Sequence, residues 1–179
     1  MPNAKKYILT GVTLGCIAAV AAGLIAVTNL ITAKKIAQNE IDAVNKGIAS
    51  IFGDSEIKNE GKVSGHDYVT YYYQVDYKNS ELEMHGYAFK CEGSNMYGKV
   101  SLIAGFDEKS NFMSLYLIKN EQTYASTLVD KYVVPLNDAE SSKKDEALDD
   151  VSCGATYGAK LVREMINDAK AASSEFWSK

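Results

Sequence analysis

The residues with the clearest chemical potential lie in one short polar segment near the end of the chain. Residues 149–158 read DDVSCGATYG and turn through Gly154 into a stretch with helical spacing. Thr156 stands where the first helical turn begins, and its small neighbours leave the hydroxyl accessible. Unpaired N–H groups and a partial positive charge at a helix N-terminus favour a phosphate at this point. The same hydroxyl could instead cap the helix and do nothing more, so both alternatives stay open.

Other chemistries lack the residues that they require. His66 and His85 are 19 residues apart, without an acidic or thiol companion at ligand spacing, and the three Cys residues are scattered. This pattern offers no set of ligands for a structural zinc ion. No nucleophile–His pair accompanies the threonine either. We therefore expect no metal ligands and no catalytic residues.

The charges are unevenly distributed along the 179 residues. Residues 1–35 contain Lys residues but no acidic residue. All 23 acidic residues follow, together with 15 of the 19 basic residues. A nucleic-acid binder needs a basic face to neutralise phosphates, and this acidic portion does not provide one. We expect no nucleic-acid partner.

Residues 7–33 form an uncharged apolar stretch that predicts a single membrane-spanning helix. These 27 residues would extend roughly 40 Å as a helix, more than the hydrocarbon layer of about 30 Å. A cleaved signal peptide has a shorter apolar core, so an uncleaved anchor in the lipid bilayer is the favoured interpretation. Small residues such as Gly11 and Gly15 would let another transmembrane helix approach closely. Lys residues on both sides of the span leave its orientation undecided.

The chain after the span divides into a connecting helix and a folded domain. Apolar residues at helical spacing predict a helix over residues 34–53 that continues from the membrane. The resulting organisation has three parts: the N terminus and span at 1–33, the juxtamembrane helix at 34–53 and the domain at 54–179.

The domain has the pattern of an α+β fold. Alternating, aromatic or β-branched stretches predict strands at residues 68–77, 82–91, 98–107 and 112–119. Residues 54–67 are rich in turn formers, residues 138–150 predict a polar loop or short surface helix, and residues 157–172 predict an amphipathic helix. Antiparallel-looking strands with helices at both ends indicate a mainly antiparallel sheet flanked by helices. The 11 tyrosines after the span are interpreted mainly as sheet residues.

The polar segment resembles the flavinylation motif of the FMN-binding domain family, Asp-x-x-Ser/Thr-Gly-Ala-Thr. Asp150, Gly154, Ala155 and Thr156 match this motif, and Cys153 stands where the family has a hydroxyl residue. The best-known members are the G subunit of the Rnf complex and the C subunit of the sodium-translocating NADH:quinone reductase. In that family the last Thr carries FMN through a phosphoester, which a separate Mg-dependent flavin transferase installs from FAD. The resemblance implies that Thr156 is the acceptor and that the other four residues border the cofactor.

Further segments resemble the family in the expected order. Residues 29–40 resemble the membrane-exit region of Rnf G subunits, and residues 97–107 resemble a family strand. Glu121 and Thr123 lie where the family has Glu-Thr-Pro-Gly, in a loop that borders the flavin. They are the candidates for contact with the isoalloxazine ring. Residues 124–126 replace the Pro-Gly-Leu of that loop.

The resemblance implies an electron-transfer subunit of the ion-translocating Rnf complex, anchored in the cell membrane beside other Rnf subunits. Its N terminus is expected in the cytoplasm and its flavin domain outside, where a disulfide between Cys91 and Cys153 is conceivable and two free thiols are the alternative. Because FMN supplies the redox chemistry, the protein's part is to hold and tune it. The open alternatives are a quinone-reductase C subunit, a free-standing anchored flavoprotein, and an anchored binding module without flavin.

Overall fold

The computed structural model describes residues 3–79 and 82–178. Its contacts divide the chain into two compact units, Met1–Asp42 and Ala43–Lys179. Helix α1 (Asn3–Phe52) contributes most of its length to the first unit and its last ten residues to the second. The helix predicted after the span is therefore the continuation of the same α-helix.

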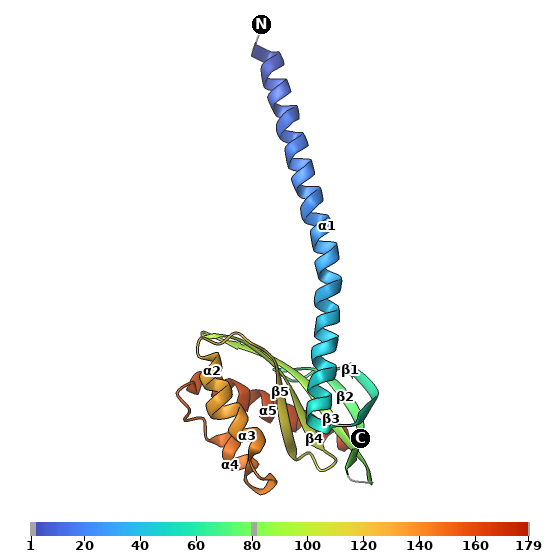
Figure 1. The fold of residues 1–179 in the computed structure, drawn as a ribbon, viewed down its shortest axis with the longest axis vertical. Coiled ribbons are helices and arrows are strands. Elements are labelled where there is room, and N and C mark those ends of the chain that lie inside the picture. The colour runs from blue at the N-terminus through green and yellow to red at the C-terminus, as the bar shows by residue number, and fades with distance from the viewer. Residues whose placement is uncertain (1–2, 80–81, 179) are drawn as a thin grey trace. The chain divides into compact units, whose positions relative to one another are not determined.

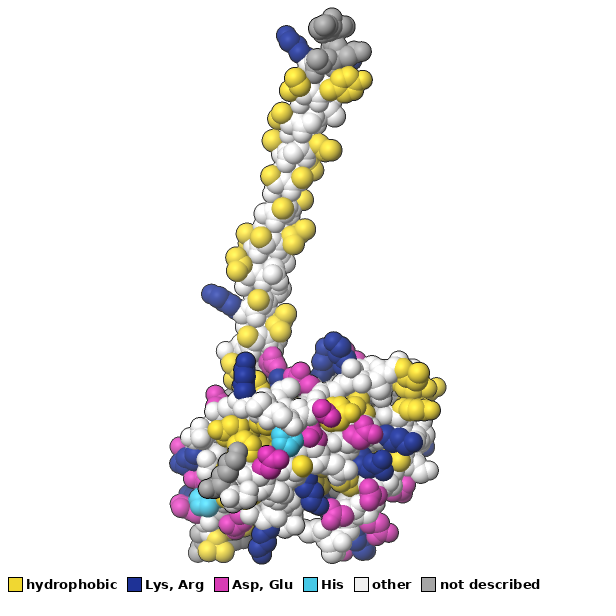
Figure 2. All heavy atoms as spheres, turned by 180° about the vertical axis from the view of Figure 1, so that it is seen from behind, with side chains coloured by type: hydrophobic (Ala, Val, Ile, Leu, Met, Phe, Trp, Pro, Cys, Tyr) yellow, Lys and Arg dark blue, Asp and Glu magenta, His cyan; other side chains and the backbone are white. Residues whose placement is uncertain are grey.

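The first unit is one long apolar helix. Its side chains are exposed along the apolar stretch, and Figure 2 shows hydrophobic side chains along it with Lys or Arg side chains near either end. Thr hydroxyls in this stretch donate to the carbonyl four residues earlier, as Thr13 does to Leu9 at 2.9 Å, which satisfies them without water. The described residues contain one helix that is long enough and apolar enough to cross a membrane, and it is this helix. It suggests a single-pass membrane anchor.

The second unit is built on a five-stranded antiparallel sheet. Its strands follow the chain in the order β1-β2-β3-β4-β5, each paired with the next (Figure 1). The strands are β1 (Ser55–Lys62), β2 (Val69–Asn79), β3 (Leu82–Asn95), β4 (Gly98–Asp107) and β5 (Phe112–Asn120). A long apolar helix followed by this sheet and its helices confirms the α+β prediction.

Strand β1 lies inside the segment expected to be rich in turns, so that expectation is wrong for residues 55–62. β1 pairs only with β2, at the edge of the sheet. Its sequence SEIKNEGK is polar because most of its side chains face solvent, and Ile57 is the apolar residue that packs against the core. Edge strands commonly carry charges in this way. Residues 55–62 thus form a strand because they pair with β2, although their sequence lacks the hydrophobic alternation that predicts a strand.

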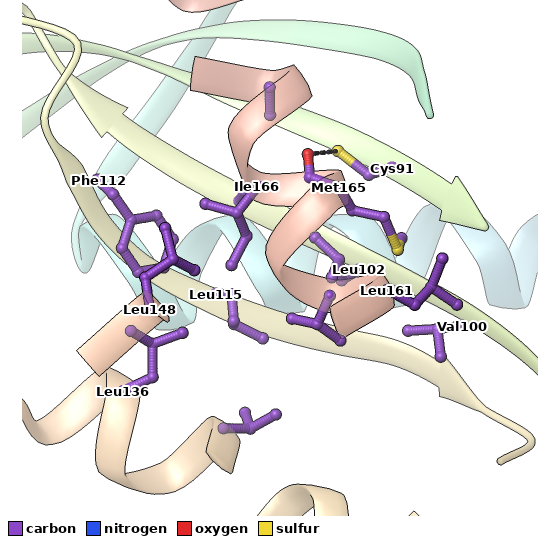
Figure 3. Packing of buried hydrophobic residues seen from close by; sticks show 14 of the residues in the cluster. Cys91, Val100, Leu102, Phe112, Leu115, Leu136, Leu148, Leu161, Met165 and Ile166 are labelled. Atoms are coloured by element: carbon purple, nitrogen blue, oxygen red, sulfur yellow. Dashed lines mark hydrogen bonds between the residues drawn. The ribbon is translucent and has the colours of Figure 1, made fainter. Parts of the chain in front are cut away.

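Two cores cover the two faces of the sheet. Adjacent residues of β3 point to opposite faces, so that Ala88 joins the core under α1 while Phe89 joins the core under the C-terminal helix. Val44, Ile48 and Phe52 are the buried residues by which the end of α1 covers the first face. On the second face, side chains of the C-terminal helix point toward the strands (Figure 3).

The helices of the second core come after β5. They are α2 (Ala125–Leu128), the π-helical turn η1 (Val129–Val133), α3 (Val134–Asp138), the 3-10 turn η2 (Ser141–Lys143), α4 (Lys144–Asp149) and α5 (Thr156–Trp177). The polar stretch 138–150 therefore contains two short helical elements, of which α4 buries Leu148 in the core. Helix α5 was predicted for 157–172 and extends five residues further.

Candidate functional site

A cavity of about 250 Å³ opens at the first turn of α5. Its lining comes from three places in the chain: the turn between β3 and β4, the loop after β5, and the segment that enters α5. The lining residues are Tyr97, Gln122, Tyr124, Gly154, Ala155, Thr156, Tyr157 and Gly158. No charged side chain is among these described lining residues. The structure thus brings three of the sequence-predicted site residues, Gly154, Ala155 and Thr156, into one cavity.

Thr156 is the first residue of α5, and the N-cap position belongs to Ala155. The structure does not favour a capping role for the Thr156 hydroxyl, because Ala155 holds the N-cap position and no side-chain cap hydrogen bond is formed there. The first hydrogen bond of the helix runs from the Ala159 N–H to the Ala155 carbonyl at 3.0 Å. The preceding N–H groups lie outside the intrahelical ladder, as at any helix N-terminus. Thr156 is thus half-buried and lines a cavity beside the positive end of a 22-residue helix.

Small residues keep the space around this hydroxyl open. Gly154 has a φ of +80°, a conformation that a glycine adopts without steric cost. A Cβ on Gly158 would lie 3.1 Å from Leu128 Cδ2 and 3.3 Å from Gln122 Oε1. A side chain at Gly154 would therefore strain the backbone of the turn, and one at Gly158 would crowd Leu128 and Gln122 beside the cavity. This geometry fits a phosphate group held at Thr156.

Gln122 is the functional candidate that the sequence reasoning missed. Its side chain is buried, and Nε2 donates to the Gly98 carbonyl at 2.6 Å and to Asn95 Oδ1 at 3.1 Å. Asn95 in turn donates to the Tyr157 carbonyl at 3.0 Å. These bonds connect the loop after β5 with the β3–β4 turn and the first turn of α5. In an extended segment, successive side chains point to opposite sides. This alternation is the sequence signal that would have indicated Gln122, rather than Glu121 or Thr123, as the residue at the cavity.

Glu121 and Thr123, the predicted ring contacts, do not line the cavity. Glu121 forms an ion pair with Lys119 at 2.7 Å, and this hydrogen-bonded lysine lowers the pKa of the Glu121 carboxyl. The Thr123 N–H and hydroxyl both donate to the Tyr97 carbonyl, at 3.0 and 3.3 Å. Both residues hold the loop in place while Gln122 between them faces the cavity.

Asp150 and Cys153 shape the segment that leads into the cavity. Asp150 ends α4 and accepts a hydrogen bond from the Ser152 N–H at 3.1 Å, which turns the chain. Cys153 is buried in the core, where a thiol behaves as a small hydrophobic group. This burial explains how the site accommodates Cys in place of a hydroxyl residue.

Cys91 and Cys153 are both free thiols. Of the two alternatives that the sequence left open, the structure therefore has the unpaired one. Cys91 lies inside the core, with Sγ 3.8 Å from the Met165 carbonyl (Figure 3). Burial raises the pKa of the Cys91 thiol, so it stays neutral and unreactive.

Three tyrosines at the cavity depart from the interpretation of tyrosines as sheet residues. Tyr97 lies in the β3–β4 turn, Tyr124 in the loop before α2, and Tyr157 in the first turn of α5. The rings of Tyr97 and Tyr157 are 5.3 Å apart between centroids. Three of the eight described residues that line the cavity are therefore aromatic.

The two histidines lie elsewhere and have structural partners. His66 Nδ1 is 2.8 Å from Asp168 Oδ1, and His85 Nδ1 is 2.6 Å from Asp76 Oδ1. Among residues 3–79 and 82–178, no group of three or more His, Cys, Asp or Glu could hold a metal ion.

Comparison with known proteins gives a family match for the N-terminal part of the chain. Residues 1–51 match the family model of the RnfG N-terminal region. This match supports an RnfG-family protein. No curated protein matches the chain.

The match is to the N-terminal region alone, so what it indicates is coarse. It suggests a subunit of the multi-subunit Rnf complex, which is a redox complex, and the RnfG family is associated with flavin. The matched residues 1–51 almost coincide with α1, so the match covers the long apolar helix. The cavity at Thr156 lies outside that match.

Proposed function

We propose that this chain is an electron-transfer subunit of an Rnf complex that carries FMN covalently on Thr156 through a phosphoester. The observation that carries the proposal is the position of Thr156, which is half-buried, lines the cavity and is the first residue of α5. The family match at the other end of the chain independently favours a flavin-associated redox complex.

Thr156 would hold the phosphate and the start of α5 would stabilise its charge. The ester would form between the threonine oxygen and the flavin-side phosphorus of FAD, with AMP as the leaving group, through a flavin transferase. Free N–H groups and the helix dipole favour the anion by about 0.3–1 kcal/mol at an exposed site. Gly154 and Ala155 add no bulk beside the phosphate. Asp150 and Cys153 would position this turn without touching the cofactor.

The uncharged cavity lining supports a carrier role. Bound FMN would supply one- and two-electron redox chemistry. The described lining offers hydroxyl, amide and aromatic groups but no carboxylate, imidazole or ammonium that could act as a general acid or base. The chain's own residues would therefore bind and orient the cofactor rather than perform a separate reaction.

The anchor would keep this carrier beside its partners. We infer a cytoplasmic N terminus, a single span and a flavin domain outside the cell membrane, with the span against other Rnf membrane subunits. Small residues of the span, among them Gly11 and Gly15, leave the space that close helix packing requires, since a Cβ on either would meet nothing in this chain. Coupling of electron flow from ferredoxin to NAD with ion transport would be a property of the whole complex.

Mass spectrometry of the full chain co-expressed with a flavin transferase tests the proposal. We expect an FMN-sized adduct on the peptide that contains Thr156, and flavin fluorescence that survives denaturation. Thr156→Ala should abolish the adduct. Ser152→Ala is the matched control, because it removes an exposed hydroxyl from the same segment and should keep the adduct. An unmodified parent, or an unchanged adduct in Thr156→Ala, would disprove the assignment.

A further inference from the structure

We propose that the isoalloxazine ring packs against the side chains of Tyr124 and Tyr157 at the mouth of the cavity. This inference rests on the proposed attachment of FMN to Thr156. It replaces Glu121 and Thr123, which are not among the lining residues of the cavity, as the residues that contact the ring.

The exposure of these two tyrosines is unusual within the domain. Tyr124 is 57% exposed and Tyr157 is 59% exposed. Among the aromatic residues described from Ala43 onward, they are the two that are classed as exposed. Both line the same cavity. Two exposed aromatic rings from separate segments at one cavity indicate a flat apolar ligand.

The cavity is too small to enclose a whole FMN. Its volume of about 250 Å³ lies below the range of about 300–1,000 Å³ that is typical of pockets for drug-sized ligands. The phosphate and the chain next to it would occupy the part beside Thr156. The ring would then lie at the mouth, against the exposed faces of the two tyrosines.

Tyr97 holds one of these rings in position. Its ring centroid is 5.3 Å from that of Tyr157, with 35° between the ring planes. Lys160 Nζ lies 6.0 Å from the Tyr157 ring centroid, so a cation also stands near this surface. Because Tyr157 follows Thr156 directly, a group esterified to the threonine is tethered within reach of that ring. Tyr124 approaches from the loop before α2.

Flavin fluorescence tests this contact independently of electron-transfer activity. A tyrosine ring in contact with a photoexcited flavin donates an electron to it and quenches its emission, whereas phenylalanine stacks without doing so. The full chain in detergent, co-expressed with a flavin transferase, would be compared with Tyr124→Phe, Tyr157→Phe and the double variant. Tyr71→Phe, a half-buried tyrosine of β2 outside the cavity, is the matched control.

We expect the fluorescence lifetime per bound flavin to lengthen several-fold in the double variant, to a smaller extent in each single variant, and not at all in Tyr71→Phe. Unchanged lifetimes in a fully flavinylated double variant would overturn the inference and leave the proposed function standing. A parent without flavin would overturn both. Because Tyr124 is distant in sequence from the motif whereas Tyr157 directly follows Thr156, the Tyr124 variant tests the contact even if Tyr157→Phe hinders attachment.

Discussion

The side-chain amide of Gln122 donates a hydrogen bond to the Gly98 carbonyl at 2.6 Å. Through this bond, the loop after β5 is fixed to the first residue of β4, and Asn95 extends the link to the first turn of α5. The loop that carries Tyr124 and the helix that carries Thr156 are therefore linked by side-chain hydrogen bonds that start from the buried Gln122. The position of the proposed acceptor depends on residues that are distant from it in the sequence.

Replacement of Gln122 by Leu should destabilise the domain by about 1–3 kcal/mol, because the partly buried Gly98 carbonyl and Asn95 Oδ1 would lose their donor. Glu121→Ala is the control, since its ion pair with Lys119 is exposed and exposed pairs contribute little to stability. Urea unfolding of the full chain in detergent measures both. The single tryptophan, Trp177, reports on this domain because its ring packs 4.8 Å from that of Tyr87. Equal stability of the two variants would contradict this prediction.

Gly98→Ala should be much more destabilising than Gly65→Ala. Both glycines have positive φ, 137° and 94°, so a side chain costs about 1–2 kcal/mol of backbone strain at either. A Cβ on Gly98 would also overlap the backbone carbonyl of Glu121, whereas one on Gly65 would meet nothing. The overlap adds about 1–3 kcal/mol. Similar unfolding midpoints for both variants would show that the loop after β5 yields easily.

Removal of the Asp168 carboxylate should destabilise the domain by about 1–3 kcal/mol. This group lies 2.8 Å from His66 Nδ1 and also accepts the Tyr68 N–H at 2.7 Å, so it anchors the start of β2 to α5. The control is Asp76→Ala at the second His–Asp pair, where His85 is 53% exposed and we expect a change of about 0–1 kcal/mol. Thermal unfolding of both variants measures the two losses of stability. Equal losses in Asp168→Ala and Asp76→Ala would contradict the prediction.

The stability contributed by Tyr132 should depend on alkaline pH. Its hydroxyl donates to the Leu148 carbonyl at 2.7 Å inside the core, and burial raises the pKa of this phenol in the folded chain. Above a pH of about 10 the unfolded chain releases the proton while the folded chain retains it, so stability falls as the pH rises. Tyr132→Phe should cost about 0.5–1.5 kcal/mol near neutral pH. Its deficit relative to the parent should shrink above about pH 10, and a constant deficit would contradict the prediction.

Local periodicity was sufficient for the elements that have a strong repeat. The uncharged stretch and the apolar spacing after it predicted α1, and alternating residues predicted β2 to β5. It failed for β1, whose polar residues reflect an edge position, and for the helices from Ala125 to Asp138. Those short helices are stabilised by burial of residues such as Leu128 and Tyr132 rather than by intrinsic propensity.

The sequence by itself determined that a hydroxyl would stand after a glycine turn at the start of the last helix, because turn and helix signals are local. Only the tertiary structure decided which side chains surround that hydroxyl. Gln122 rather than Glu121 or Thr123 faces the cavity, and Tyr97, Tyr124 and Tyr157 meet there from three segments. The physical reason is that the direction of a side chain depends on strand register and on the packing of a loop against distant residues, which no local pattern records.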